Sequence, residues 1–406
     1  MGLAGDFCQQ MKTIQKGYRF ALLPTREQEV LLMKHFGCAR FVYNHFLERT
    51  LGCGEGNHTF NYDQQAARLT QLKKQEATAW LKEVNSQSLQ AALRHLDTAF
   101  DNFFDGRAEL PRFKNKRKKN SFTVPQFVKV SDSQLFIPKF KEGIRFIAHR
   151  KLKGQIRHCT ISKTSTGKFF VSILCEVCHE PMKPTQKQVG IDLGLKDFAV
   201  CSDGTRFKNH CHLKRYERRL ATAQKHLSRK KNGSKGRTRQ RLKVAAMHEK
   251  VTNTRQDLLH KVSGQIINAY DTICVEDLNV KGMMANRKLA KHIGDAGWGT
   301  FVRMLEYKVS WNDKRIVKIN RFYPSSKTCN QCGYIHRDLK LSERTWICPN
   351  GHVLDRDLNA SKNILEEGLR IIGAELSDYT DGGSNQTSEK KHKPVKSEAH
   401  WSLANG

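Results

Sequence analysis

Residues 322–363 read FYPSSKTCNQCGYIHRDLKLSERTWICPNGHVLDRDLNASKN and bring two kinds of site together. Cys329, Cys332 and Cys348 follow the spacing C-x2-C-x15-C, and His352 lies four residues further on. Two knuckles separated by about 15–20 residues are typical of a zinc ribbon, in which four nitrogen or sulfur ligands surround the ion tetrahedrally. The sequence therefore predicts a structural zinc site.

The fourth ligand of this zinc site is less clearly marked than the first three. A second C-x2-C would need a cysteine at the position of Gly351. His352 is the nearest donor and gives a Cys3His site, because an imidazole reaches further than a thiol. His336, inside the intervening loop, is the alternative ligand. A loop of free thiols that has lost its metal is the remaining interpretation.

The composition indicates a polyanionic partner. The 406 residues include 71 Lys and Arg against 39 Asp and Glu, which gives a net charge of +32. An excess of this size favours nucleic-acid binding, because neutralising phosphates releases counterions. Binding to an anionic membrane would need an amphipathic anchor, and none stands out in the sequence.

The cysteines and the apolar segments indicate the compartment. No apolar run is long enough to span a membrane, and we find no secretory leader. The twelve cysteines are irregularly spaced in a long chain, which favours a reduced compartment over a disulfide framework. We therefore expect a cytoplasmic protein. Residues 1–10, MGLAGDFCQQ, resemble an upstream extension, since Met11 opens a better strand pattern.

The first half of the chain predicts one strand, then helices, then a run of strands. Thr25 is the expected N-cap of the first helix, and Gln28 completes a capping box. From 121 onward, period-two patterns separated by turn residues predict an antiparallel barrel or sandwich. The expected elements are a strand over 11–23, a helix pair over 25–49, helical runs over 62–80 and 86–104, and strands over 121–180.

Two strongly basic segments are candidates for phosphate contact. Residues 111–120, PRFKNKRKKN, carry six basic side chains and no acid. Residues 214–243 carry thirteen Lys or Arg and one acid, Glu217, within a predicted helical hairpin that turns at 232–236. This imbalance argues against a helix surface stabilised by its own ion pairs. The candidate contacts are Arg112, Lys114, Lys116, Arg117, Lys118, Arg218, Arg229, Lys230 and Arg237.

Three acids have the positions expected of a catalytic site. Asp192 lies within an apolar strand, Glu276 ends a second apolar strand, and Asp357 begins a helix. This pattern is typical of an RNase H-like nuclease, in which clustered carboxylates hold two Mg²⁺ ions about 3.5–4 Å apart. Asp355 is the alternative third acid, although its position also suits a helix cap. The sequence predicts catalytic, magnesium-binding roles for Asp192, Glu276 and Asp357.

With these motifs in view, the chain resembles the TnpB family of RNA-guided nucleases encoded by bacterial insertion sequences, which are relatives of miniature type V CRISPR effectors. The resemblance spans residues 11–372, and its segments follow the family's order. They are RFVYNHFL (40–47), GIDLGLKDFAV (190–200), VEDLNV (275–280), DAGWG (295–299), YPSSKTCNQCG (323–333) and DRDLNA (355–360).

The resemblance implies a multidomain α+β fold. A wedge-like β-barrel is interrupted by a helical recognition domain and followed by an RNase H-like (RuvC) α/β nuclease domain with a zinc-ribbon insert. The implied boundaries are 1–10 for the extension, 11–24 and 105–180 for the wedge, 25–104 for the recognition domain, 181–187 for a linker, 188–320 and 354–374 for the nuclease, 321–353 for the ribbon, and 375–406 for a disordered tail.

The resemblance also implies the partners and the site residues. One chain would bind one guide RNA and cut double-stranded target DNA beside a short target-adjacent motif, in the bacterial cytoplasm and on the nucleoid. The catalytic acids fall on Asp192, Glu276 and Asp357, and Tyr62 and Gln90 match motif-reading positions. Two other functions stay open: an RNA-guided DNA-binding repressor that does not cut, and a DNA transposase that uses the same metal chemistry.

Overall fold

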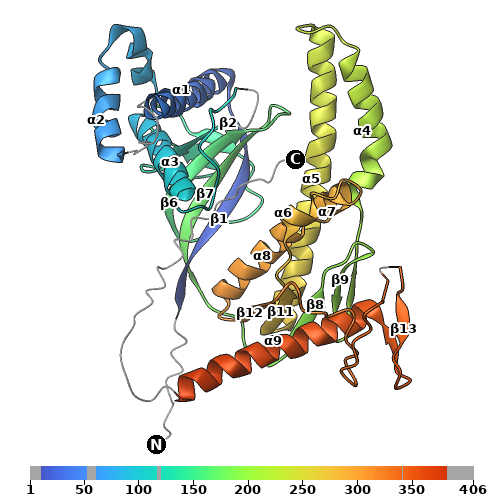
Figure 1. Cartoon of the computed structure of the whole chain (residues 1–406). Helices are drawn as coiled ribbons and strands as arrows, with labels where there is room; N and C mark the ends of the chain where they lie inside the picture. Colours follow the sequence, from blue (N-terminus) through green and yellow to red (C-terminus); the bar gives the residue numbers. More distant parts are fainter. Residues whose placement is uncertain (1–10, 53–60, 117–119, 341, 382–406) are drawn as a thin grey trace, which may run out of the picture. The chain divides into compact units, whose positions relative to one another are not determined.

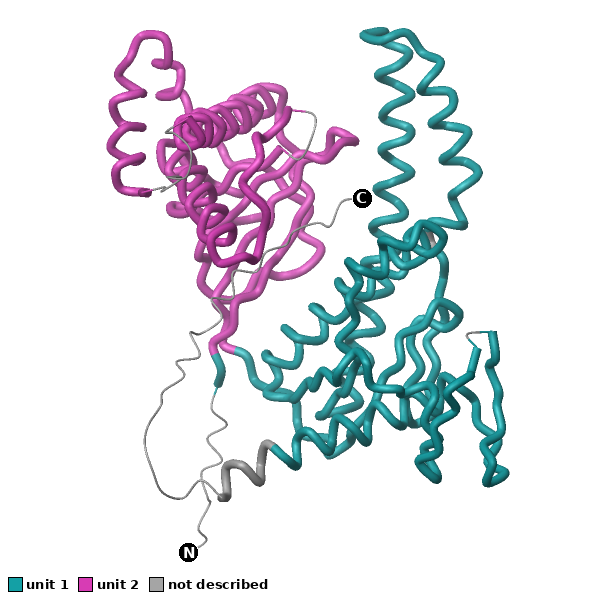
Figure 2. The backbone as a smooth tube through the Cα atoms, in the orientation of Figure 1, with its two compact units in different colours: residues 1–12, 179–396, 401–406 teal, residues 13–178, 397–400 magenta. Residues whose placement is uncertain are grey.

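The computed structural model describes residues 11–52, 61–116, 120–340 and 342–381. The predicted extension over 1–10, most of the predicted tail (382–406), and the candidate contacts Arg117 and Lys118 lie outside the described residues. The described chain divides into two compact units, Thr13–Cys178 and a second that begins at His179 and includes Lys12 (Figure 2). Among the described residues, no helix combines the length and the apolar character needed to cross a membrane.

The unit over Thr13–Cys178 is built on one seven-stranded sheet, in the order β2-β6-β7-β1-β5-β4-β3 (Figure 1). The first strand of the chain, β1, lies in the middle of the sheet. Its neighbours β7 and β5 come after the helices in the chain. The strands are β1 (Lys12–Leu23), β2 (Asn120–Val124), β3 (Lys129–Ser131), β4 (Gln134–Phe136), β5 (Ile144–Phe146), β6 (Gln155–Lys163) and β7 (Phe169–His179).

The sequence predicted an antiparallel barrel or sandwich, and the resemblance implied a wedge-like β-barrel, whereas the sheet is open. β2 and β3 are its two edges, and they do not pair with each other in the described part of the chain. A barrel closes only when the hydrogen-bond register continues around all strands. Here the register ends at β2 and β3, so the sheet is open.

The helices of this unit pack on the sheet and share its core. They are α1 (Arg26–Leu51), α2 (Tyr62–Leu72), the 3₁₀ helix η1 (Glu76–Glu83) and α3 (Ser86–Phe104). The capping box is confirmed, since the Thr25 side chain accepts from the Gln28 N–H and the Gln28 side chain accepts from the Thr25 N–H. The predicted helix pair is wrong, because α1 runs unbroken through Gly37. A glycine inside a helix weakens it by about 1 kcal/mol, which the buried face of α1 offsets.

The second unit contains a five-stranded mixed sheet in the order β10-β9-β8-β11-β12. β8, β11 and β12 are parallel, whereas β9 and β10 run antiparallel to their neighbours. The strands are β8 (Gln188–Asp192), β9 (Asp197–Cys201), β10 (Arg206–Lys208), β11 (Thr272–Glu276) and β12 (Arg315–Ile319). The helices between them are α4 (His212–Ser228), α5 (Lys235–Ala269), α6 (Val280–Met283), α7 (Ala290–Ala296) and α8 (Trp298–Trp311).

The two faces of this sheet are covered by different helices. Val189 and Ile191 of β8 pack with α5 and α8, together with Ile273 and Val275 of β11. The opposite face is covered by α9 (Arg356–Asp381), whose Ile364 packs on Cys274 and Ile319 (Figure 1). Since side chains alternate along a strand, every second residue of β8 and β11 faces α9.

Helix α9 lies very close to the sheet because two glycines leave room for it. A Cβ added at Gly190 would lie 2.0 Å from the carbonyl oxygen of Ser361, and one at Gly368 would lie 2.3 Å from Cys274 Sγ. The helix continues past the predicted domain end at residue 374 to Asp381, so the first residues of the predicted tail are helical.

The segment between β12 and α9 forms a small hairpin of its own. Its strands are β13 (Thr345–Ile347) and β14 (Val353–Asp355). Trp346, Leu354 and Leu339 pack with Cys329 and Cys348 into a separate small core. This core has few apolar side chains, and cores of this size are typically stabilised by a metal or by disulfides.

Candidate active site and metal centre

Two acids extend from neighbouring parallel strands. Ile191 of β8 lies opposite Val275 of β11, and both are buried beneath α5 and α8. The next residue on each strand points to the other face, so Asp192 and Glu276 lie on the face that α9 covers. Both acids sit at the carboxyl ends of their strands, which meet at one edge of a parallel sheet.

The third acid comes from the first turn of α9. Ser361 lies one turn after Asp357 and packs its backbone on Gly190, two residues before Asp192 in β8. The electrostatics agree with this placement: burial, then the charge of Glu276, then that of Asp357 raise the pKa of Asp192 to about 7. The structure therefore brings together the three acids that the sequence singled out.

Asp355, the alternative third acid, has a different role. Its Oδ1 accepts a hydrogen bond from the Leu358 N–H at 2.9 Å, which is the contact expected of a helix N-cap. Arg206 Nη2 lies 3.0 Å from the same oxygen. Partial burial works in the opposite direction, but these contacts lower the pKa of Asp355 below its usual value. Asp355 is therefore the N-cap of α9.

In the described part of the chain, Ser325 and Arg344 also contact the acids, and the sequence analysis did not find them. Ser325 Oγ donates a hydrogen bond to Glu276 Oε1 at 2.5 Å. Arg344 Nη1 lies 3.1 and 3.2 Å from the two carboxylate oxygens of Asp357. Ser325 lies within the motif YPSSKTC, which could have drawn attention to it. No local pattern distinguishes Arg344 from the many other basic residues.

The four predicted zinc ligands also lie together. Cys329, Cys332, Cys348 and His352 present ligand atoms that all lie within 4.8 Å of one another. His352 Nδ1 is 3.2 Å from Cys348 Sγ and 3.6 Å from Cys329 Sγ, and the Cys332 and Cys348 sulfurs are 3.7 Å apart. Within the described part of the chain, no other His, Cys, Asp or Glu group is this compact, and the three acids are more widely spaced.

The turns of the two knuckles explain why His352 can complete the cluster. In the first knuckle, Gly333 has φ +72° and its N–H bonds the Cys329 carbonyl at 2.8 Å. In the second, Gly351 has φ +82° and its N–H bonds the Cys348 carbonyl at 2.9 Å. Glycine adopts this left-handed backbone at no steric cost. The turn at Gly351 carries His352 back toward the thiols.

The other histidine of this segment lies elsewhere. The ring of His336 packs edge-on against Trp346, with centroids 5.5 Å apart. It is not part of the compact group of ligand atoms. The geometry therefore favours His352 as the fourth ligand.

Comparisons with known proteins show which family this chain belongs to. A Streptomyces pristinaespiralis protein named "Putative RNA-guided DNA endonuclease" is 38% identical over 397 residues, which cover 96% of this chain and 98% of that protein. An Escherichia coli K12 protein named "Putative RNA-guided DNA endonuclease InsQ" is 32% identical and covers 89% of this chain and 94% of its own length. The OrfB_IS605 family model, described as "Probable transposase", matches residues 172–287. The chain belongs to the TnpB family.

Further matches concern parts of the TnpB-family chain and its fold. Residues 298–364 match a model described as "Cas12f1-like, TNB domain". Residues 11–51 match one described as "Helix-turn-helix domain", although here they form one strand and one helix. The fold is similar to a chain in "Cryo-EM structure of the Cas12f1-sgRNA-target DNA complex", with TM-score 0.56 and 13% identity over 87% of this chain and 98% of that chain.

The two candidate motif-reading residues lie on the helices of the first unit. Tyr62 begins α2, and its ring stacks with the Arg94 guanidinium, 5.1 Å from the ring centroid. Gln90 is exposed on α3, one turn before Arg94. Residues four apart share one helix face, so Tyr62, Gln90 and Arg94 belong to one surface.

The basic segment after α3 is anchored at Lys114. Its backbone N–H and carbonyl bond the Asn44 side chain at 2.8 and 2.9 Å, and its Nζ lies 3.7 Å from the Tyr43 ring centroid. Arg112 is exposed beside Glu109, and the exposed Lys116 is the last described residue before 120. The aromatic contact holds the charge of Lys114 at the surface of α1.

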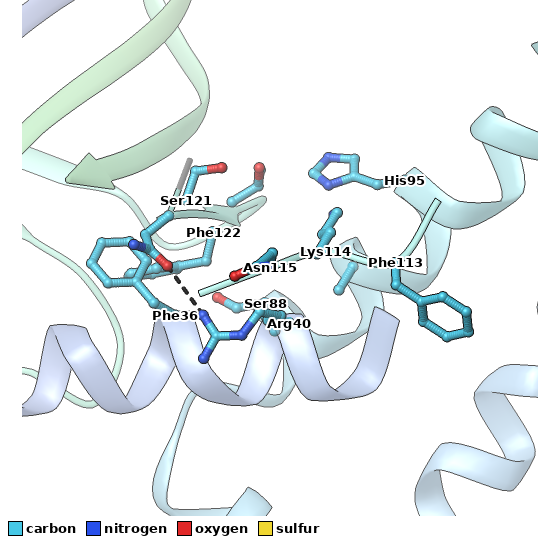
Figure 3. A pocket seen from close by; sticks show the side chains of 13 residues that line it. Phe36, Arg40, Ser88, His95, Phe113, Lys114, Asn115, Ser121 and Phe122 are labelled. Atoms are coloured by element: carbon cyan, nitrogen blue, oxygen red, sulfur yellow. Dashed lines mark hydrogen bonds between the residues drawn. The ribbon is translucent and has the colours of Figure 1, made fainter. Parts of the chain in front are cut away.

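A cavity of about 250 Å³ lies beside this segment, between α1, α3 and β2 (Figure 3). Arg40, Ser88 and Lys114 are among its lining residues, and Arg40 Nη1 bonds Asn120 Oδ1 at 3.1 Å. The hydroxyl of Ser88 is buried and has no hydrogen-bond partner in the described part of the chain. The cavity belongs to the first unit, whereas the three acids belong to the second.

The basic hairpin of α4 and α5 has one structural arginine and several exposed ones. Arg237 Nη1 donates to the carbonyls of Leu227 and Lys230 at 2.8 and 2.9 Å, so its guanidinium closes the turn. Arg218, Arg229 and Lys230 are exposed. Only a small core joins the two helices, with Leu220, Ala223 and Val244 buried. The hairpin is thus an arm with most of its surface available.

Proposed function

We propose that this chain is an RNA-guided DNA endonuclease. It would bind a transposon-derived guide RNA and cut double-stranded target DNA beside a short target-adjacent motif. The observation that carries the proposal is the meeting of Asp192, Glu276 and Asp357 at one edge of the sheet. The names of the relatives, the Cas12f1-like fold and the charge of +32 support it.

The chemistry we propose is metal-dependent phosphodiester hydrolysis in an RNase H-like, RuvC-type domain. Asp192, Glu276 and Asp357 would hold Mg²⁺, and their carboxylate oxygens are the ligands that this ion prefers. Without a cation these acids raise the pKa of Asp192, so the site suits a group that brings positive charge. Two bound Mg²⁺ ions would supply an activated water and stabilise the leaving oxygen.

The chain's own residues would prepare this site. The half-buried Asp192 would keep one side open to the substrate and water, and Ser325 would orient the carboxylate of Glu276. One guanidinium nitrogen of Arg344 contacts both carboxylate oxygens of Asp357, and its positive charge would face an approaching phosphate. The sheet order, with three antiparallel strands followed by two parallel ones, suits the RNase H-like assignment.

For the second metal site we propose structural zinc. The three thiols and the imidazole form a closed set of four donors within 4.8 Å, which fits a tetrahedral ion with no open position. A hydrogen bond from the Tyr334 N–H lowers the pKa of the Cys332 thiol, which favours the thiolate that zinc needs. Zinc would supply the stability that the small core of this hairpin lacks.

We propose that the remaining parts hold the nucleic acids, with one chain for each guide RNA. The first unit would combine the wedge (11–24 and 105–180) with the recognition helices (25–104), and Tyr62 and Gln90 would meet the target-adjacent motif. The exposed basic residues of the first unit and the α4–α5 hairpin would contact phosphates of the guide and its heteroduplex. The nuclease would comprise 188–320 and 354–374, with the ribbon over 321–353.

The test is to purify the chain from cells that carry its element and sequence the nucleic acid that copurifies. We expect one RNA species whose 3′ segment can be changed to redirect Mg²⁺-dependent cutting of plasmid DNA. A transposase would bring down no such RNA and would bind element ends. A repressor would bind the guided target without cutting it. Either result would replace the proposed function.

A further inference from the structure

The loop between β12 and the first cysteine knuckle contacts the active site through one side chain. Ser325 is 4% exposed, and its Oγ donates to Glu276 Oε1 at 2.5 Å. This short contact is typical of a hydroxyl that donates to a carboxylate. Burial raises the pKa of the half-buried Glu276 carboxyl, and the hydrogen bond from Ser325 works in the opposite direction. This hydrogen bond fixes the orientation of the Glu276 carboxylate relative to the loop.

Two asparagines of α9 fasten the same loop. Asn359 and Asn363 are four residues apart, so they share one face of the helix, and they are 2% and 1% exposed. Their amide nitrogens both lie 2.6 Å from the Thr328 carbonyl. Asn363 Nδ2 also lies 2.7 Å from the Ser325 carbonyl. We call these two side chains the asparagine clamp.

The asparagine clamp reaches the metal centre as well as the acid. Asn359 Oδ1 accepts a hydrogen bond from the Asn330 N–H at 3.0 Å. Thr328 and Asn330 are the two neighbours of Cys329 in the chain. The clamp thus holds the backbone on both sides of the first thiol, and it holds the Ser325 carbonyl on the side of the acid. Its two asparagines lie on α9, two and six residues after Asp357.

The asparagine clamp restrains the backbone of the loop around Ser325 and Cys329. Buried amides and carbonyls in a fully bonded network are costly to disturb, because each broken contact leaves an unsatisfied polar group. In a solvated loop, water would bond these backbone groups. Here the buried side chains of Asn359 and Asn363 bond them instead. The arrangement connects Cys329, Ser325 and Glu276 through backbone that is held at Thr328 and Asn330.

We infer that Ser325 is a positioning residue for Glu276, and that the asparagine clamp makes this positioning depend on an intact cysteine–histidine centre. The inference rests on the proposed function of the three acids. Ser325 acts through Glu276 and need not touch the nucleic acid. Groups that orient a metal-binding carboxylate typically change metal affinity 10–100-fold when they are removed, by the general range for such partners. Tight binding of divalent cations at the three acids would therefore depend on an intact cysteine–histidine centre, although that centre is a separate metal site.

The test measures cation binding directly, so that it does not depend on cutting. Full-length chain with its copurified RNA is titrated with Mn²⁺ at constant ionic strength, and free Mn²⁺ is followed by its paramagnetic resonance signal. We expect Ser325→Ala to weaken binding about 10-fold, and Ser325→Thr to restore most of it because the hydroxyl is kept. Ser326→Ala is the matched control, since the neighbouring hydroxyl is not the one that bonds Glu276.

The dependence on the metal centre is tested with a double-mutant cycle. His352→Ala should weaken Mn²⁺ binding by itself, and adding Ser325→Ala should weaken it little further, because both changes release the same carboxylate. RNA binding and the far-ultraviolet circular dichroism spectrum report whether each variant is folded. If the two effects on Mn²⁺ affinity simply add, the clamp does not couple the sites.

The outcomes separate this inference from the function on which it rests. A parent chain that binds no Mn²⁺ at the acids would overturn both. A parent that binds Mn²⁺, with a folded Ser325→Ala variant that binds equally well, would overturn the inference alone. In either case RNA-guided cutting by the parent is measured separately, with Mg²⁺, on the same preparation.

Discussion

Asp192 and Glu276 follow directly after Ile191 and Val275, which are paired on neighbouring parallel strands. The pairing puts two carboxylates side by side on the face that α9 covers. Helix α9 adds Asp357, and the resulting repulsion contributes to raising the pKa of Asp192 to about 7. Three clustered carboxylates are a donor set that suits a divalent cation, and this property makes the site testable.

The first prediction concerns catalysis. Asp192→Ala should reduce guided DNA cutting at least about 100-fold, because removal of a direct metal ligand should cost no less than loss of a group that orients one. RNA binding should be unchanged, which a filter-binding titration checks. Asp257→Ala is the control, since Asp257 forms an exposed ion pair with Lys261 on α5. Cutting by Asp192→Ala at the parent's rate would refute the assignment of this acid.

The second prediction concerns stability and pH without added Mg²⁺. The pKa of Asp192 rises from 3.8 in the reference state to about 7 in the folded chain, so the folded state binds more protons between these values. The free energy of unfolding contributed by this group therefore falls as pH rises through that window, and stays low above it. Asp192→Asn removes this effect and should be more stable than the parent near pH 8.

Denaturant unfolding at about pH 5 and about pH 8 checks this prediction. The advantage of Asp192→Asn over the parent should be larger at the higher pH. Added Mg²⁺ should stabilise the parent there and leave the variant nearly unchanged, since only the parent keeps the full set of carboxylates. An equal advantage at both pH values would mean that Asp192 does not titrate in this window.

The third prediction concerns the zinc ligands. His352→Ala should lose bound zinc, because its Nδ1 lies 3.2 Å from Cys348 Sγ and 3.6 Å from Cys329 Sγ. His336→Ala should keep zinc, since that ring packs on Trp346 instead. Metal analysis by mass spectrometry, which we expect to give one zinc per parent chain, distinguishes the two variants. The reverse result would exchange the roles of the two histidines.

The fourth prediction concerns the basic hairpin. Replacing Arg218, Arg229 and Lys230 by Glu should weaken RNA binding and flatten its salt dependence, by a slope of about 0.7–0.9 for each phosphate contact that is lost. Arg237→Gln is an informative comparison, because the Arg237 guanidinium is bonded to the carbonyls of the turn. That variant should lower thermal stability more than it changes the slope. An unchanged slope in the triple variant would show that this face is only solvated.

The fifth prediction concerns the docking of α9. Gly190→Ala would put a Cβ 2.0 Å from the Ser361 carbonyl oxygen, so the helix must move away from β8. Overpacking of this kind typically costs about 1–3 kcal/mol. We expect a lower melting temperature and a strong loss of cutting, because Asp357 moves with α9. Gly299→Ala is the control, since no atom lies within 4 Å of the added carbon. Equal melting temperatures for the two variants would contradict the close approach.

Local signals in the sequence determined a large part of this protein. The capping box of Thr25 and Gln28, the cysteine spacing and the apolar strands around Asp192 each reflect interactions between residues close in the chain. The position of each acid at a strand end or helix start also follows from such patterns. Where a local signal was ambiguous, as at Gly37, the prediction of a helix pair was wrong because packing on the sheet outweighs the weak helix propensity of one glycine.

Only the tertiary structure decided which distant residues meet. The roles of Ser325 and Arg344 follow from the folding of one segment against Glu276 and Asp357, 49 and 13 residues away in the chain. Asp355 pairs with Arg206, which comes from another strand, and caps α9, whereas Asp357 lies with the other two acids. The choice between His336 and His352 depends on the turn at Gly351 and on the packing of Trp346. A sequence records which donors and acceptors exist, whereas their pairing is set by the packing of strands and helices that are remote in the chain.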